Sequence, residues 1–318
     1  MRSLKSTAAV FAATAAMVLG GGLGTAAASP AHTAASPRAA AALCSSAAVS
    51  GLAVSGALPS AEVQRQLASR TAQHRAQYGI AAKGPLGTAA AGDAVGQPRV
   101  DIHPAQGTSF KSASGADGSC ATQSVSTQLT VADTATTIYT PTMYPPGGSC
   151  VELVTVYTKS VRSVSAWDWC KSVNFAASVT INSSFLSTYT NGSGAYTGRV
   201  IRTSAAANTW TAALYNYSTA HWDTLFTQSG TNKSGRTDGW DIEELYSTVG
   251  PSGRAYSCDD MAGTTFESSN ISVRNNGVWS SASPANSDTH YDQPNSAFYC
   301  PARSYQMISV YDHWKAVG

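Results

Sequence analysis

The pattern of apolar and polar positions changes once along the chain, close to residue 119. Beyond this point many short segments are rich in Thr, Val, Tyr, Trp and Phe and alternate between apolar and polar residues, as strands do. They cover residues 151–157, 177–185, 196–203, 209–217, 224–227, 271–279 and 305–311. Turn sequences such as Asn275-Asn276-Gly277 separate them. The pattern predicts a mainly β fold, an antiparallel β-sandwich, over residues 119–318.

Residues 29–118 have a different pattern, because Ala, Ser and Gly dominate and large apolar side chains are scarce. One short helix is predicted there. Ser60 is a suitable N-cap, Val63 and Leu67 lie on one face, and Gly79 is a stop signal. We interpret this region as an Ala-rich low-complexity linker or pro-segment that precedes the sandwich domain.

The first 28 residues have the order of a secretory signal peptide. Arg2 and Lys5 precede an apolar run over 8–19, and the small residues 26–28 form an A-x-A cleavage site. This apolar run is too short to span a bilayer, and no later segment approaches that length. We therefore assign 1–28 to a signal peptide and expect a secreted, extracellular protein that does not bind membranes.

Charge and motifs exclude several classes of function. Only 12% of residues are charged and the net charge is +2, without a basic block that would bind nucleic acid. The chain lacks GxSxG, SxxK, HExxH and a glycine-rich phosphate loop. We expect a monomer without a cofactor.

Six cysteines remain after the signal peptide, at positions 44, 120, 150, 170, 258 and 300. In an oxidising compartment they predict up to three disulfides, with 15 pairings to choose from. None has CxxC spacing, which argues against zinc and redox sites. Cys44 lies outside the predicted sandwich, and we expect it to pair with Cys120.

Aromatic residues suggest a binding surface. All seven tryptophans follow residue 166, and Trp167-Asp168-Trp169 puts two indoles on one face of a strand. Tyr217 and Trp222 fall on a predicted hairpin. Exposed rings of this kind stack on sugars, so Trp167, Trp169, Tyr217 and Trp222 are candidate ligand-binding residues. The alternative is that they fill the core of a jelly-roll or concanavalin-like sandwich.

Another polar group, Asp288-x-His290-x-Asp292, would place three side chains on one face of an extended segment. A metal could use such a set, but two carboxylates and one imidazole are too few ligands alone. A solvated loop is the simpler interpretation, and we predict no metal site.

The most charged stretch is DGWDIEELYST, residues 238–248. As a strand it would present Trp240 and Ile242 on one face, with Asp241 and Glu243 on the other. Two carboxyls two residues apart on one face can raise each other's pKa, which suits a general acid or base. Glu244 would share the tryptophan face.

This stretch carries a family resemblance. The segment Thr211-Ala-Ala-Leu-Tyr-Asn216-Tyr-Ser-Thr-Ala220, followed by Trp240-Asp-Ile-Glu243-Glu, resembles the C-terminal part of the glutamic endopeptidases, the eqolisins. Those secreted β-sandwich enzymes carry a hairpin Asn-Leu-Thr-Thr-Gly, then a strand of acidic, aromatic and aliphatic residues ending in a catalytic Glu. The resemblance covers about residues 208–244. It implies that Glu243 is catalytic and aligns Asn216 with the hairpin Asn.

The chain also departs from that family. Gly239 replaces an acidic residue and Asp241 an aliphatic one. The family's catalytic glutamine has no matching motif, because Gln123 and Gln128 are the only glutamines between Cys120 and Tyr217.

Two functions remain open. The first is binding of an extracellular polysaccharide or another polymer through aromatics. The alternative is an acid hydrolase acting on a protein substrate with Glu243 and Asp241, or a glycosidase in which Glu243 pairs with Asp168 or Glu152.

Overall fold

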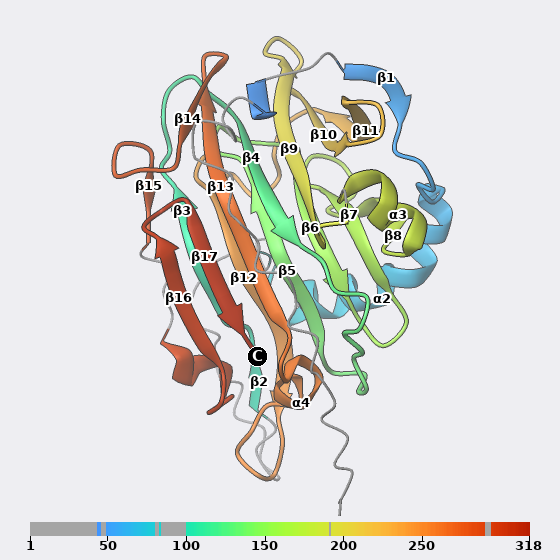
Figure 1. The fold of residues 1–318 in the computed structure, drawn as a ribbon, viewed down its shortest axis with the longest axis vertical. Coiled ribbons are helices and arrows are strands. Elements are labelled where there is room, and N and C mark those ends of the chain that lie inside the picture. Colours follow the sequence, from blue (N-terminus) through green and yellow to red (C-terminus); the bar gives the residue numbers. More distant parts are fainter. Residues whose placement is uncertain (1–42, 46–48, 80–82, 84–99, 191, 290–293) are drawn as a thin grey trace, which may run out of the picture. The chain divides into compact units, whose positions relative to one another are not determined.

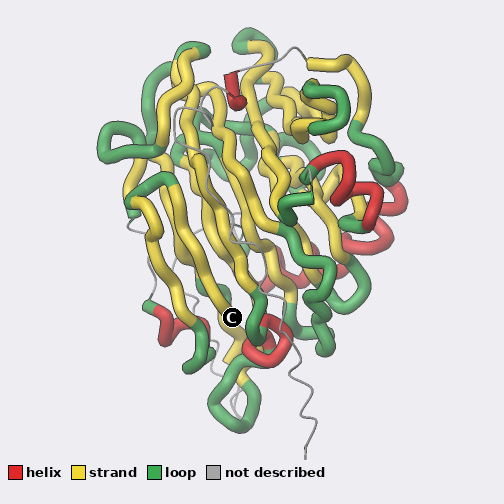
Figure 2. Tube along the Cα trace, in the orientation of Figure 1, coloured by secondary structure: helices red, strands yellow, loops and turns green. Residues whose placement is uncertain are grey.

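The computed structural model describes residues 43–45, 49–79, 83, 100–190, 192–289 and 294–318 (Figure 1). Over these residues the chain is mainly β, and its helices are short apart from one (Figure 2). The helical elements are α2 (Ser60–Tyr78), α3 (Ser183–Tyr189), α4 (Ser257–Met261) and the 3-10 turn η1 (Asn295–Phe298). The predicted signal peptide, 1–28, lies outside the described residues.

The strands form two sheets. Over the described residues, the larger has nine strands in the order β1-β11-β10-β9-β4-β13-β17-β16, with β14 paired to β13. Their bounds are β1 Val49–Ala53, β4 Ala116–Ser124, β9 Ala195–Ser204, β10 Thr209–Asn216, β11 His221–Ser229, β13 Thr265–Asn275, β14 Val278–Ser281, β16 Ser304–Ser309 and β17 His313–Val317. Pairing is antiparallel except between β1 and β11.

The smaller sheet has eight described strands in the order β15-β3-β12-β5-β6-β7-β8, with β2 also paired to β12. They are β2 Val100–Ile102, β3 Ala105–Phe110, β5 Thr137–Tyr144, β6 Val151–Tyr157, β7 Arg162–Asp168, β8 Asn174–Thr180, β12 Gly239–Val249 and β15 Ser287–Asp288. One core joins the two sheets, because Leu153 and Val164 of the smaller sheet cluster with Val200 and Ile271 of the larger. The predicted β-sandwich is confirmed.

A second apolar cluster covers the other face of the smaller sheet. Val63 and Leu67 of α2 are fully buried there against Trp167, Trp169 and further aromatic residues of the sheet. Helix α2 begins at Ser60 and ends before Gly79, whose φ of 91° is a conformation that glycine adopts readily. The predicted helix is confirmed, and its buried positions recur at helical spacing. The predicted N-cap is wrong by one residue, because Ser60 is the first helical residue and Pro59, which has no capping side chain, precedes it.

The sandwich begins earlier than the predicted boundary at residue 119. Strands β2 and β3, inside the region interpreted as a linker, pair with β12. Both they and α2 belong to the compact unit Ala34–Gly318. β3, with the sequence AQGTSF, is buried at every position, so it lacks the alternation that marks a strand facing water.

Some strand limits also differ from the predicted ones. The predicted strand 177–185 ends at Thr180, and Phe185 lies in α3, which Asn182 caps by accepting from the N–H of Phe185. β5 lies outside the predicted strands, and all eight of its residues are buried. The Asn276-Gly277 turn between β13 and β14 has positive φ at both residues, as a type I′ hairpin requires.

All six cysteines are paired, as Cys44–Cys120, Cys150–Cys170 and Cys258–Cys300. The predicted Cys44–Cys120 pair is confirmed. It ties the segment that precedes α2 to β4, in the middle of the larger sheet.

Candidate functional site

Strand β12 organises the candidate site because its two faces carry different carboxyls. Trp240, Ile242 and Tyr246 belong to the apolar cluster under α2, whereas Leu245 belongs to the core between the sheets. The predicted alternation is therefore confirmed. β12 pairs with β3 on one side and β5 on the other, so it is an interior strand.

Asp241 lies between the two sheets. Its carboxylate accepts hydrogen bonds from the side-chain amide of Gln123 on β4 and the indole of Trp314 on β17, both at 2.9 Å. The side-chain oxygen of Gln123 in turn accepts from Tyr196. Burial raises the pKa of Asp241 to about 7, although these hydrogen bonds favour the ionised form.

Glu243 also points between the sheets, but to a different partner. Its two oxygens accept from Nε and one terminal nitrogen of Arg303, whose guanidinium carbon lies 3.5 Å from the ring centre of Phe298. Both side chains of this ion pair are at most 1% exposed. Such a pair fixes the segment before β16 to β12, so the arrangement gives Glu243 a structural role. The structure thus gives Glu243 and Asp241 separate partners.

The opposite face of the smaller sheet brings two other carboxyls together. Glu152 on β6 and Glu244 on β12 flank β5, so their strands are roughly 10 Å apart. Both side chains are fully buried. We call the residues around them the covered acidic site: Glu152, Glu244, Lys83, His103, Thr142, Trp169, Trp240 and Tyr246.

Glu152 is held by donors from three strands or their ends. The indole N–H groups of Trp240 and Trp169 donate to its two oxygens at 3.1 Å each, and the hydroxyl of Thr142 donates to one of them. Burial raises the pKa of Glu152, while the ammonium of Lys83 opposes that shift.

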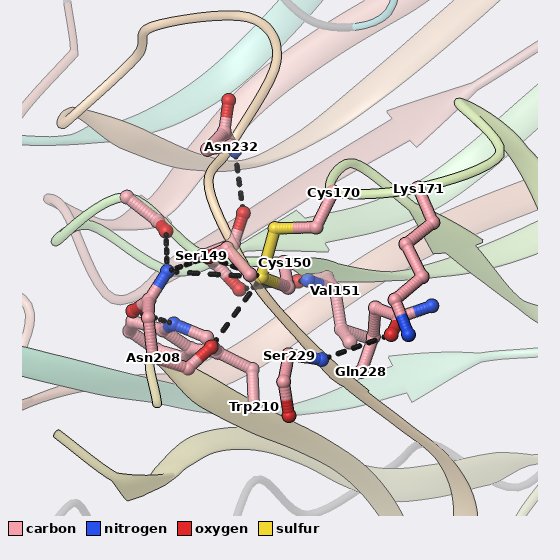
Figure 3. Close-up of a disulfide and its surroundings, with 12 residues drawn as sticks. Ser149, Cys150, Val151, Cys170, Lys171, Asn208, Trp210, Gln228, Ser229 and Asn232 are labelled. Carbon is pink, nitrogen blue, oxygen red and sulfur yellow. Dashed lines mark hydrogen bonds between the residues drawn. A yellow bond between two sulfur atoms is a disulfide. The ribbon is translucent and has the colours of Figure 1, made fainter. Parts of the chain in front are cut away.

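The Cys150–Cys170 disulfide fixes this part of the site (Figure 3). It links the start of β6 to the turn after β7, and the backbone N–H of Trp169 donates to the carbonyl of Cys150 at 2.8 Å. Asn232 donates to the loop before Cys150, and Figure 3 shows it beside the bridge. Because Glu152 and Trp169 flank the two cysteines, the disulfide sets their relative position.

Glu244 is held by different groups. One oxygen lies 2.7 Å from Nε2 of His103 and accepts from the hydroxyl of Tyr246 at 3.1 Å. The Tyr246 ring is sandwiched between two imidazoles, His103 at 3.9 Å and His74 of α2 at 3.8 Å between ring centres. Burial lowers the pKa of His74 to about 3, and neighbouring positive groups add to that effect.

Lys83 connects the two carboxyls. Its ammonium lies 3.2 Å from Glu152 and 3.5 Å from Glu244, so the two oxygens cannot be farther apart than the sum of these distances. It also lies 4.5 Å from the ring centre of Tyr139. The Lys83 side chain is 3% exposed. Lys83 and α2 together cover the site, and we call these residues the N-terminal or covering segment.

The predicted aromatic residues divide between two places. Trp167 and Trp169 belong to the cluster under α2, and Trp167 is 2% exposed. Trp222 packs beside the Cys44–Cys120 bridge with the guanidinium of Arg199 over its ring, and Tyr217 is half-buried. Helix α2 buries Trp167 and Trp169, and the packing around the Cys44–Cys120 bridge buries Trp222. Ligand binding by these residues remains a prediction.

The sequence pattern suggests Glu152 only as a partner for Glu243 and does not single out Lys83. The signal for Glu152 is a lone carboxylate in the otherwise uncharged run Val151–Tyr157. A charge inside a fully buried strand needs a buried partner. Lys83 has no comparable local signal, because its partners are 69 and more residues away.

Over the described residues, no group of three His, Cys, Asp or Glu side chains converges as a metal site requires. His290 and Asp292 of the DTHYD motif lie outside that part of the chain. Among the helices that the structure describes, none is long and apolar enough to cross a membrane.

Comparison with protein-family models and with curated proteins gives no match. Among solved structures the chain is similar to SCP-B, a member of the eqolisin family of peptidases in complex with the tripeptide Ala-Ile-His. That comparison has a TM-score of 0.39 and 13% identity over 69% of this chain and 98% of that chain. Scytalido-glutamic peptidase with a peptide-based transition-state analogue gives 0.38 and 14% over the same shares. The weak, partial resemblance carried by residues 208–244 is thus also found among solved structures.

Proposed function

We propose that the chain is a secreted acid hydrolase of peptide bonds, with Glu152 and Glu244 as its catalytic groups and its N-terminal segment holding it latent. The convergence of two buried carboxyls on one ammonium, on an aromatic face, carries this proposal. Carboxyls placed so that one is protonated and the other ionised are the usual means of acid hydrolysis. Three disulfides are compatible with an extracellular protein.

The raised pKa of Glu152 suits it to be the acid. In the proposed reaction, ionised Glu244 takes a proton from water, whose oxygen bonds to the carbonyl carbon, while Glu152 gives its proton to the carbonyl oxygen. Glu244 then passes its proton to the leaving nitrogen as the C–N bond breaks. The hydroxyl proton returns to Glu152 as the carbonyl reforms, so both groups regain their starting states.

A peptide substrate is favoured over a sugar substrate because Lys83, the residue now in the site, belongs to a polypeptide. Lys83 and the preceding helix α2 lie over Glu152, Glu244 and the tryptophans. Substrate can reach the carboxyls only after this segment moves. The Cys44–Cys120 bridge would keep it attached after a cut elsewhere in the segment.

The test is hydrolysis of a denatured protein between pH 3 and 7, with products read by mass spectrometry. Glu152→Gln and Glu244→Gln should each lower the rate by at least about a hundredfold, because each removes a titrating proton. In Glu152→Gln the amide oxygen can accept from only one of the two indoles, so the melting temperatures of both variants are measured alongside the rates. Glu267→Gln is the matched control, since Glu267 is partly exposed and pairs with His313 in the larger sheet. Full activity in Glu152→Gln or Glu244→Gln would overturn the proposal.

Polysaccharide binding is a second candidate, favoured by the position of Trp167 and Trp169 on the same covered face. It predicts retention on an insoluble polysaccharide that depends on displacement of the N-terminal segment. Trp167→Ala should then weaken retention, whereas a protein that never binds once the segment is displaced would rule this candidate out.

A further inference from the structure

The covered acidic site has the composition of a receptor for a single ammonium group. Lys83 has two carboxylates within 3.5 Å and the Tyr139 ring centre at 4.5 Å, with the Trp167 and Phe175 rings at 5.6 and 5.9 Å. Carboxylates and aromatic faces both attract a cation, and burial strengthens that attraction.

The sandwich supplies the carboxylates and the Tyr139 ring that contact the ammonium, and the N-terminal segment supplies the ammonium itself. Glu152, Glu244 and Tyr139 come from β6, β12 and β5 of the smaller sheet, and all three side chains are at most 1% exposed. The indoles, Thr142, His103 and Tyr246 hold both carboxylates in place without using Lys83. Removal of the lysine would therefore leave a formed pocket with two acidic groups.

The geometry also distinguishes the kind of cation. Lys83 makes one contact to each carboxylate, from strands that lie on either side of β5. A point-like ammonium can divide itself between two such groups, whereas a planar guanidinium favours a paired contact with one carboxylate.

We infer that this pocket binds the side-chain ammonium of a lysine from another polypeptide, and that Lys83 occupies it as an internal substitute. The inference rests on the proposed function because it names the regulation of that same site. An ammonium between Glu152 and Glu244 takes the place of the water and the scissile carbonyl, so a lysine bound there inhibits the site and competes with the covering segment.

The first test uses the full chain with Lys83→Ala, which removes the guest and leaves the pocket. Addition of n-butylammonium chloride should raise the melting temperature of the variant by about 5 °C, while equal concentrations of 1-butanol and sodium chloride should not. n-Butylguanidinium should have a smaller effect. The wild type and Lys111→Ala, whose lysine is exposed, should show no such rise in melting temperature with any of them.

A second measurement needs no variant. In the wild type, excess n-butylammonium should compete with Lys83 and increase amide hydrogen exchange in α2, while 1-butanol should not. If neither protein distinguishes n-butylammonium from 1-butanol, the inference is overturned, even where Lys83→Ala fails to fold.

The source of the ammonium is tested with acetyl-lysine-methylamide and glucosamine oligomers on the same variant. Stronger stabilisation by the lysine derivative supports a polypeptide, and stronger stabilisation by the amino sugar overturns that assignment. Ammonium-selective binding without any peptide hydrolysis would leave the pocket in place and overturn the proposed function alone.

Discussion

The two faces of β12 use carboxyls in opposite ways. On the inner face, Asp241 and Glu243 are bound by groups from the body of the sandwich, such as Trp314 and Arg303. On the outer face, Glu244 shares its counter-charge with Glu152, and that charge, Lys83, comes from the covering segment. One strand thus separates carboxyls that hold the fold together from carboxyls whose partner can be exchanged.

The faces should also respond to acid in opposite directions. Asp241 has a raised pKa, so the folded state holds its proton more tightly than the unfolded chain does. His74 on the outer side has a lowered pKa, so the folded state resists its protonation. Acid therefore stabilises the inner layer and weakens the packing of α2.

The largest expected effect is the acid release of α2. The pKa of His74 falls from 6.5 to about 3 on folding, so its contribution is complete above 6.5 and is lost as pH falls toward 3. The loss is on the order of 5 kcal/mol at the lower end. The hydrogen-exchange protection factors of Ser60–Tyr78, which correct for the slower intrinsic exchange in acid, should therefore fall between pH 6.5 and 3.5 while β4 stays protected.

The control for that prediction is His74→Phe. A phenyl ring keeps the stacking on Tyr246 but cannot take up a proton. The groups around it, Arg70, Lys83, His103 and Glu244, stay unchanged. If α2 opens in acid as readily in this variant as in the wild type, His74 does not drive the release.

A second prediction concerns the inner ion pair. Glu243→Gln leaves the Arg303 guanidinium buried without its counter-charge, which should cost about 3–5 kcal/mol of unfolding free energy in urea titrations at pH 7. Glu267→Gln, which removes a partly exposed partner of His313, should cost less than about 1 kcal/mol.

This variant also separates the two candidate sites. The eqolisin resemblance implies that Glu243 is catalytic, whereas its partners here assign it to the fold. Loss of hydrolysis in Glu243→Gln with unchanged stability would favour the resemblance and contradict the structural role.

The sequence could predict the alternation of β12, because alternation depends only on the residues of one strand. It could not predict which face carries a site, since that depends on the cover. Glu152 and Glu244 meet across β5, and the pairing of distant strands leaves no local pattern. The same reasoning explains the tryptophans: a period of two assigns Trp167 and Trp169 to one face but does not reveal that α2 lies over it.

Gln123 shows a related limit. Its surroundings in the sequence carry no motif, yet the antiparallel arrangement of β4 and the packing of the sheets place its amide 2.9 Å from Asp241. Only the contact between the sheets makes this pair, so the local sequence pattern indicates the aspartate but not its glutamine partner.

The smallest expected effect belongs to Asp241. Its pKa rises from 3.8 to about 7 on folding, so the stability it contributes is full in acid and is lost as pH rises toward 7. Between pH 4.5 and 6.5 the unfolding free energy should fall by on the order of 3 kcal/mol from this group.

Asp241→Asn has no titrating proton, so its urea midpoint should vary less over that range, although its amide can satisfy only one of the donors from Gln123 and Trp314. Unfolding measured at both pH values in wild type and variant, with β4 followed by hydrogen exchange, isolates the inner face from α2. An equal pH dependence in the two proteins would show that the inner face does not favour acid, and the opposition between the two faces of β12 would fail.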